Sequence, residues 1–140
     1  MDLNRATIIG RLTNDPESRT TPSGQTVTSF SIATNFRWTD ANGQKQDKAE
    51  FHNIVAWRKL AETITTYLKK GSRIYLEGRL QTRSWDDQNG VKKFRTEIIA
   101  DNMIMLDAKS DGKTPSPSYE KNEPAKQDEE EEINIEDIPF

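Results

Sequence analysis

The 140-residue sequence contains no cysteine and a single histidine, His52. Without cysteine the chain forms no disulfide bond and offers no thiolate for catalysis or metal binding. One histidine without neighbouring ligand residues does not make a zinc-type cluster. We therefore expect no metal and no cofactor, and we expect His52 to be structural or to lie at an interface.

Long apolar stretches are also missing. No run of 18 or more apolar residues occurs, so the sequence predicts no transmembrane helix and no membrane partner. The opening residues, MDLNRATIIG, lack the basic start, apolar core and small-residue cleavage site of a signal peptide. These absences predict a soluble cytoplasmic protein.

Charge is divided unevenly along the chain. Residues 1–109 carry 17 Lys and Arg against 13 Asp and Glu, a net charge of +4. Residues 110–140 carry 3 against 10, a net charge of −7. The overall charge of −3 therefore combines a mildly basic domain with a strongly acidic tail.

The stretch from Ser72 to Trp85, SRIYLEGRLQTRSW, alternates in a way that is typical of a strand. Its even positions are apolar or small, whereas its odd positions include Arg79, Arg83 and Trp85. An ordinary strand with one solvated face is the simplest interpretation. Guanidinium groups beside an exposed indole, however, suit a ligand that has both phosphates and stackable rings.

Five segments are predicted as strands, and they are residues 3–12, 25–36, 48–57, 72–85 and 91–100. Gly10 in the first strand indicates a bulge or a close backbone approach. Residues 13–25 are predicted as a loop, and two Asn-Gly pairs predict hairpin turns. Residues 58–70 change to helical spacing and are the one predicted helix.

This order predicts an all-β fold, namely a five-stranded OB-fold barrel with one helix between strands 3 and 4, in residues 1–106. A generic β-sandwich is the alternative. Residues 107–132 contain three prolines and no Ile, Leu, Val, Phe or Trp, which predicts a disordered acidic linker. Residues 133–140, INIEDIPF, regain apolar residues among acids and are predicted to be a partner-docking tip.

Four aromatic residues are candidates for stacking on nucleic-acid bases, and they are Trp38, Phe51, Trp57 and Trp85. Each stacked base contributes roughly 1–3 kcal/mol whatever the base is, so binding would have little sequence preference. A core position for all three tryptophans is the alternative. Basic residues interleave with the rings and would track a phosphate backbone, unless each is an ordinary solvated charge.

The chain resembles the bacterial single-stranded-DNA-binding proteins, the SSB family. The resemblance covers residues 1–106 and the last few residues, and its blocks are IIGRLTNDPESR, FSIATN, EFHNIVAWRKLAE, YLKKGSRIYLEGRLQTRSW and DIPF. It implies an OB-fold, assembly as a homotetramer, and single-stranded DNA wrapped around the tetramer. The family's stacking positions fall on the four aromatic residues named above.

The resemblance also assigns phosphate contacts to five basic residues: Lys59, Lys69, Lys70, Arg83 and Lys93. Asn53 and Gln81 are neutral where the family often has a basic residue, and we infer that Arg79 compensates. The acidic tip Asp137-Ile138-Pro139-Phe140 corresponds to the segment with which SSB relatives recruit replication, repair and recombination proteins. A terminal carboxylate and acids would meet a basic rim, while Ile138, Pro139 and Phe140 would enter an apolar pocket.

Three other functions stay open at this point. Base stacking does not distinguish RNA from DNA, so an OB-type RNA-binding module fits the same residues. An enzyme is disfavoured because no acid/base or metal constellation is present. A pure recruitment adaptor would need only the C-terminal tip.

Overall fold

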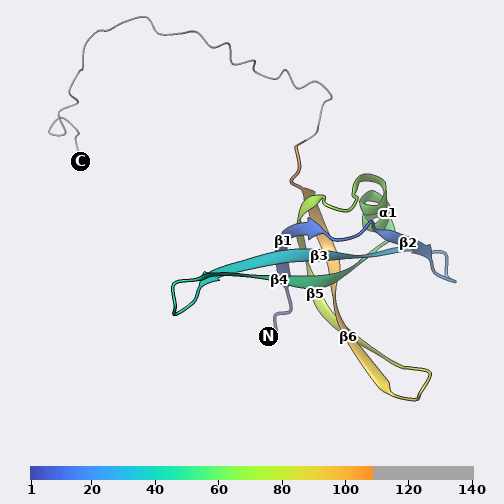
Figure 1. The fold of residues 1–140 in the computed structure, drawn as a ribbon. Coiled ribbons are helices and arrows are strands. Elements are labelled where there is room, and N and C mark those ends of the chain that lie inside the picture. The colour runs from blue at the N-terminus through green and yellow to red at the C-terminus, as the bar shows by residue number, and fades with distance from the viewer. Residues whose placement is uncertain (109–140) are drawn as a thin grey trace, which may run out of the picture. The chain divides into compact units, whose positions relative to one another are not determined.

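Six strands and one helix form in residues 1–108, the part of the chain that the computed structural model describes. In chain order they are β1 Ala6–Leu12, β2 Glu17–Thr20, β3 Thr26–Thr39, β4 Lys45–Trp57, α1 Arg58–Tyr67, β5 Arg73–Asp86 and β6 Lys92–Met105 (Figure 1).

The strands close into a barrel through pairings at both ends of the strand order. β1 pairs antiparallel with β5 on one side and with β3 on the other. β3 pairs with β4, β5 pairs with β6, and a short parallel contact between β4 and β6 completes the ring. The helix follows the third barrel strand, β4. The predicted five-stranded OB-fold barrel is therefore confirmed, and the sandwich alternative is wrong.

One piece of the first barrel strand was not predicted. The sequence predicted a loop over residues 13–25, but Glu17–Thr20 forms β2 and pairs with Ser29–Thr26 of β3. β1 ends on the same strand, with Leu12 opposite Ile32. β2 thus continues the first strand after a break, and its pairing with β3 outweighs the turn-forming composition.

The core lies inside the barrel and consists of aliphatic side chains at alternate strand positions. Ile32, Ile54, Ile74 and Leu76 are fully buried, as period-two alternation predicts when one face turns inward. Gly10 is where two strands approach closely, because a Cβ there would lie 2.4 Å from a methyl carbon of Ile32. The predicted close approach at that glycine is confirmed.

Two hairpin arms extend beyond the barrel (Figure 1). The β3–β4 arm comprises residues 35–50, and the β5–β6 arm comprises residues 79–96. Both faces of each arm are largely exposed, so the alternation that buries side chains in the barrel does not bury them here. Phe36 and Leu80 continue the apolar alternation of β3 and β5, which by itself predicts an inward face, but they are 67% and 48% exposed.

The helix packs over the barrel through its inward side, where Ala61 and Ile64 are fully buried. It ends at Tyr67, earlier than the predicted Lys70, because Leu68 adopts an extended backbone and buries its side chain instead. Gly71 then takes a positive φ of 90°, consistent with the predicted stop. Within residues 1–108 no helix has the length and apolar character needed to cross a membrane.

Candidate nucleic-acid interface

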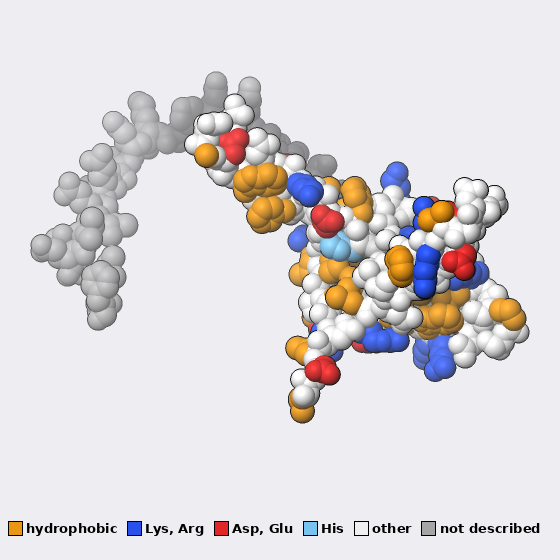
Figure 2. All heavy atoms as spheres, turned by 90° about the horizontal axis from the view of Figure 1, so that it is seen from below, with side chains coloured by type: hydrophobic (Ala, Val, Ile, Leu, Met, Phe, Trp, Pro, Cys, Tyr) orange, Lys and Arg blue, Asp and Glu red, His pale blue; other side chains and the backbone are white. Residues whose placement is uncertain are grey.

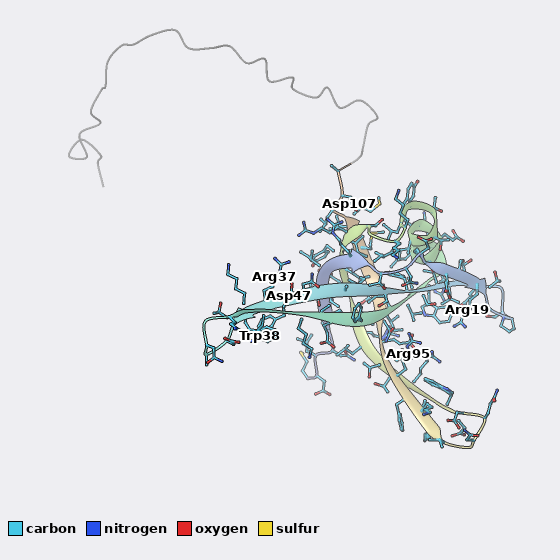
Figure 3. The ribbon with its side chains drawn as sticks, in the orientation of Figure 1. Arg19, Arg37, Trp38, Asp47, Arg95 and Asp107 are labelled. Carbon is cyan, nitrogen blue, oxygen red and sulfur yellow. The ribbon has the colours of Figure 1, made fainter. Side chains whose placement is uncertain are left out.

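A groove of about 630 Å³ runs across the outer face of β3, β4, β6 and β5. Its floor forms where Val55 of β4 lies beside Ile99 of β6 in the parallel pairing. Charged side chains line it unevenly, with four arginines against two glutamates: Arg19, Arg79, Arg83 and Arg95 against Glu17 and Glu97. Figure 3 labels two of these arginines, Arg19 of β2 and Arg95 of β6. The excess of guanidinium groups suits an anionic ligand.

Trp57 stands at the end of β4 and lines this groove with its side chain 39% exposed. The next residue, Arg58, has a φ of 58°, a left-handed conformation that turns the chain directly from β4 into α1. The turn keeps Trp57 on the barrel surface instead of in the core. The alternative in which all three tryptophans are buried is wrong, because Trp38 and Trp85 are also about 40% exposed.

A glutamate, an arginine and a tryptophan form a row on one face of β5 and β6, and the row runs from the edge of the barrel into the β5–β6 arm. Glu97 is buried to 7% exposure, and its carboxylate accepts a hydrogen bond from Nε of Arg83. The guanidinium carbon of Arg83 in turn lies 4.8 Å from the centre of the Trp85 ring, a cation–π contact. The buried carboxylate therefore orients the guanidinium, and the guanidinium covers part of one side of the indole.

The neutral residues at the two positions where a basic one was expected each accept a hydrogen bond from an arginine. Arg95 donates to Oδ1 of Asn53 at 2.6 Å. Arg79 donates to Oε1 of Gln81 at a longer distance of 3.4 Å. Positive charge thus reaches the regions of positions 53 and 81 from Arg95 and Arg79.

Phe51 and Trp57 are six residues apart on β4 and therefore lie on the same face, with Asn53 between them, and Phe51 is 62% exposed. The structure places it just outside the residues that line the groove. Trp85 is on the same face of β5 as Arg79 and Arg83. The groove side therefore carries three of the four predicted stacking residues.

Trp38 does not share that face. β3 and β4 pair without a bulge, with Trp38 opposite Gln46 and Ala33 opposite Phe51. Side chains of directly paired residues point to the same side of a sheet, so Trp38 points to the side opposite Phe51. Its ring stacks on Phe36, with 5.5 Å between centroids and an interplanar angle of 24°. Figure 3 labels Trp38 on the β3–β4 arm.

The predicted lysine contacts lie outside the groove. Lys59 is exposed on the first turn of α1, and Lys69 and Lys70 are exposed just after the helix. Lys93 is paired with Trp85 in the strand register, but its ammonium lies 3.9 Å from the carboxylate of Asp87. Figure 2 nevertheless shows Lys and Arg side chains beside hydrophobic ones over much of the surface seen from below.

The turn of the β3–β4 arm is held by one carboxylate. Asp40 accepts hydrogen bonds from the backbone N–H groups of Asn42 and Gln44 and from the side-chain amide of Gln46. The bond from Gln46, followed by that from Gln44, lowers the pKa of Asp40 below its ordinary value. Asp87 makes the matching backbone contacts in the turn of the β5–β6 arm.

A separate cluster lies on β5 away from the groove. The Tyr75 hydroxyl donates to Glu77, which also accepts from Arg5. The hydrogen bond from Tyr75 lowers the pKa of Glu77, and the same bond raises the pKa of Tyr75. His52 has a structural contact with Thr34, at 2.8 Å between Nε2 and Oγ1. In the described part of the chain no His, Asp and Glu side chains gather as a metal-binding group.

Comparison with known proteins decides the family. The model of the single-strand binding protein family matches residues 3–106, which span the whole barrel and both arms. The chain belongs to this family. The resemblance to SSB proteins that the sequence blocks indicated is therefore confirmed.

Relatives and solved structures agree with this assignment. The chain is 52% identical over 125 residues to single-stranded DNA-binding protein 1 of Chlorobaculum tepidum, covering 88% of this chain and 77% of the relative. It is 44% identical over 121 residues to a single-stranded DNA-binding protein of Neisseria meningitidis, covering 86% and 69%. The fold matches the Plasmodium falciparum SSB in complex with single-stranded DNA with a TM-score of 0.72 and 36% identity, covering 76% and 97%.

A second solved structure is a deletion mutant of the Thermus aquaticus single-stranded DNA binding protein. The TM-score is 0.67 at 32% identity, and the match covers 76% of this chain and 52% of that one. These family members share the barrel. The predicted tip residues Asp137, Ile138, Pro139 and Phe140 and nearly all of the predicted linker lie outside the described residues. Asp107, at the start of the predicted linker, accepts a hydrogen bond from the backbone of Arg73 at 2.7 Å.

Sequence reasoning did not commit to three residues that the structure brings to these surfaces. Arg19 sits on the unpredicted strand β2, and Arg95 faces the groove because β6 pairs with β4. Both depend on strand pairing, which the spacing of residues along the chain does not specify. Phe36 had a detectable signal, since it lies two residues before Trp38 on a predicted strand and therefore on its face.

Proposed function

We propose that this protein binds single-stranded DNA largely independently of sequence, protects it, and catalyses no reaction. The observation that carries the proposal is the arginine-lined groove beside Trp57 on a chain of the single-strand binding protein family. Arginines neutralise phosphates irrespective of base, and aromatic rings stack on any base. The relatives' names and the solved complex with single-stranded DNA support the same ligand.

The residues divide into two roles. Trp38, Phe51, Trp57 and Trp85 stack on bases, and their exposed rings support this role. Arg79 and Arg83 contact phosphate from the groove. Lys59, Lys69, Lys70 and Lys93 extend the phosphate path beyond the groove, and for Lys59, Lys69 and Lys70 their exposed positions near α1 support this part of the proposal.

The test is a competition experiment with fluorescently labelled dT of about 30 nucleotides, followed by anisotropy. Unlabelled dT of the same length should displace the label, and a duplex of that length should displace it far less. An equal effect of a U oligomer would favour the RNA-binding alternative. If the labelled oligonucleotide stayed bound in excess unlabelled dT, specific binding of single-stranded DNA would be contradicted. If the protein cleaved the oligonucleotide in the presence of Mg²⁺, the proposed absence of catalysis would be contradicted.

We further propose that four copies of the chain assemble as a homotetramer in the cytoplasm, associated with the nucleoid. We also propose that residues 133–140 recruit replication, repair and recombination proteins through Asp137, Ile138, Pro139 and Phe140, joined to the barrel by the disordered linker 107–132. The combination of acids with Ile and Phe in this tip supports docking to a basic, apolar-centred pocket.

The tip is tested by deleting residues 137–140 and using the full chain as the control. A pull-down of replication and repair proteins should lose its bound partners, while affinity for dT stays the same. If the variant that lacks residues 137–140 still bound these proteins, another part of the chain would recruit them. Analytical ultracentrifugation measures the mass of the assembly in solution. A mass other than that of four chains would contradict the proposed tetramer.

A further inference from the structure

Residues 1–108 contain five backbone positions with a positive φ, and four of them are glycines: Gly24, Gly43, Gly71 and Gly90. A Cβ at any of these four would meet nothing within 4 Å, so lack of space does not explain the glycines. The left-handed backbone explains them, because a Cβ makes that conformation unfavourable. The fifth position is Arg58, with a φ of 58°. Arginine therefore occupies a site of the kind that this chain otherwise gives to glycine.

The left-handed turn at Arg58 changes the direction in which the side chains point. Ile54 and Ala56 of β4 are fully buried, and an unbroken strand would turn residue 58 toward the same inner side. Instead, Trp57, Arg58 and Lys59 are all exposed. The turn thus places an arginine directly after Trp57 on the outside of the barrel, where regular alternation would expose only one of the two.

No ion pair within the described chain explains the arginine. Among residues 1–108, no carboxylate lies within 4.0 Å of the guanidinium of Arg58. This includes Glu62, which is four residues further along α1, a spacing at which ion pairs form on a helix. The left-handed backbone at Arg58 costs stability, and strain of this kind is concentrated at sites that serve a ligand.

We propose that Arg58 contacts the phosphate of the nucleotide that stacks on Trp57, and that the protein retains a strained arginine here because glycine would lose that contact. The proposal rests on the proposed binding of single-stranded DNA, and it adds a residue and a cost in stability. Trp57 lines the groove, whereas Arg58 is not among the lining residues. A guanidinium that follows an exposed indole matches a phosphate next to a stacked base.

Three substitutions separate the charge of Arg58 from the strain of its backbone. Arg58→Lys keeps both, Arg58→Ala keeps the strain and removes the charge, and Arg58→Gly removes both. Each variant is made in the full-length chain and titrated with labelled dT of about 30 nucleotides at four salt concentrations. Urea unfolding of the same variants at one protein concentration measures their stability.

The binding data should separate Arg58→Lys from the other two variants. Arg58→Ala and Arg58→Gly should bind dT up to about fivefold more weakly at a fixed salt concentration, the range for an exposed ion pair. The salt dependence of their affinity should be flatter by up to about 0.7 log units per log unit of salt, the value for one phosphate. The loss should be the same for dT and dC, since a phosphate contact does not read the base. Arg58→Lys should keep the wild-type salt dependence.

The unfolding data should separate Arg58→Gly from Arg58→Ala. Glycine adopts a positive φ without the Cβ clash, so the urea midpoint of Arg58→Gly should lie above those of Arg58→Ala and of wild type. The glycine variant would then be more stable than wild type while binding DNA less tightly. This opposite change in stability and affinity is the specific result that the proposal predicts.

Arg73→Ala is the matched control for the loss of one exposed arginine. Arg73 is exposed at the start of β5 and is not among the residues that line the groove. Like Arg58, its guanidinium has no carboxylate within 4.0 Å among residues 1–108. Arg73→Ala should keep the wild-type salt dependence of dT affinity.

Three results would overturn the proposal while leaving the proposed function intact. A wild-type salt dependence in Arg58→Ala and Arg58→Gly would show that Arg58 contacts no phosphate. A salt dependence as flat in Arg58→Lys as in Arg58→Ala would show that the charge is not what binds. A midpoint of Arg58→Gly at or below that of Arg58→Ala would show that the arginine is not strained. If wild-type protein bound no dT at all, the proposed function itself would fail.

Discussion

The guanidinium carbon of Arg83 lies 4.8 Å from the centre of the Trp85 ring while Nε of the same arginine is bonded to the buried carboxylate of Glu97. The charge of Arg83 is therefore already compensated in part within the protein. Arg79 makes no ion pair among residues 1–108, and its partner Gln81 is neutral. The two arginines should thus contribute differently to DNA binding.

We expect Arg79→Ala to flatten the salt dependence of dT affinity by up to about 0.7 log units per log unit of salt, the value for one phosphate contact on a single strand. Arg83→Ala should flatten it less, although it should still weaken binding by disturbing Trp85. Affinity measured at four salt concentrations for both variants gives the slopes. Equal slopes would mean that Glu97 does not compensate Arg83.

Glu97→Gln provides the converse test. Removing the buried carboxylate leaves the guanidinium of Arg83 without its counter-charge, so the salt dependence should steepen by up to about 0.7. Glutamine keeps the size of the side chain and an acceptor for Arg83. A slope identical to that of wild type, with urea unfolding unchanged, would contradict the prediction.

Trp57→Ala should weaken dT binding by about 1–3 kcal/mol, because a stacking surface is lost at the end of the groove. The domain should remain folded, since 39% of the residue is already exposed. Fluorescence anisotropy gives the affinity and far-UV circular dichroism gives the fold, with Tyr67→Ala as the control. A folded variant that binds dT as tightly as wild type would show that Trp57 is not a stacking site.

Gly78→Ala should destabilise the barrel. The added Cβ would lie 2.1 Å from the carbonyl oxygen of Ile99, so β5 and β6 would have to separate, at a cost of about 1–3 kcal/mol. Gly24→Ala is the control, because nothing lies within 4 Å of its Cβ and only its φ of 85° is unfavourable, costing about 1–2 kcal/mol. When both variants are unfolded in urea at the same protein concentration, the midpoint should be lower for Gly78→Ala than for Gly24→Ala.

Asp40 makes the turn of the β3–β4 arm sensitive to acid. Its folded-state pKa is lowered by the hydrogen bonds from Gln46, Gln44 and Asn42, so its stabilising effect is present above the unfolded value of about 3.9 and is lost as the pH falls through the lower, folded value. The protection of the Gln44 amide, measured as its exchange rate relative to that of an unstructured peptide at the same pH, should fall below pH ~4. Asp40→Asn should remove that pH dependence, and an unchanged profile would contradict the assignment.

The order of five strands and one helix predicted the barrel, and the period-two alternation correctly placed Ile32 and Leu76 inward. The same alternation overestimated burial at Phe36 and Leu80, because it specifies a face but not where a strand leaves the barrel. β2 was missed because four exposed residues carry no periodic signal and depend on pairing with β3.

The candidate site was predicted in part for a related reason. Spacing along one strand correctly joined Phe51 to Trp57 and Arg83 to Trp85. It did not bring Arg95 to Asn53, which are 42 residues apart in sequence and depend on the β4–β6 pairing. It also did not reveal that Trp38 and Phe51 face opposite sides, because the register of β3 against β4 is a property of the folded hairpin.

The central claim is that exposed rings and groove arginines together hold single-stranded DNA. It is tested most directly by titrating the intrinsic tryptophan fluorescence of the full chain with dT oligomers of increasing length at two salt concentrations. We predict quenching that grows with length and then saturates, with affinity that falls by about 0.7 log units per log unit of salt for each phosphate bound. Unquenched fluorescence, or binding that ignores salt, would contradict it.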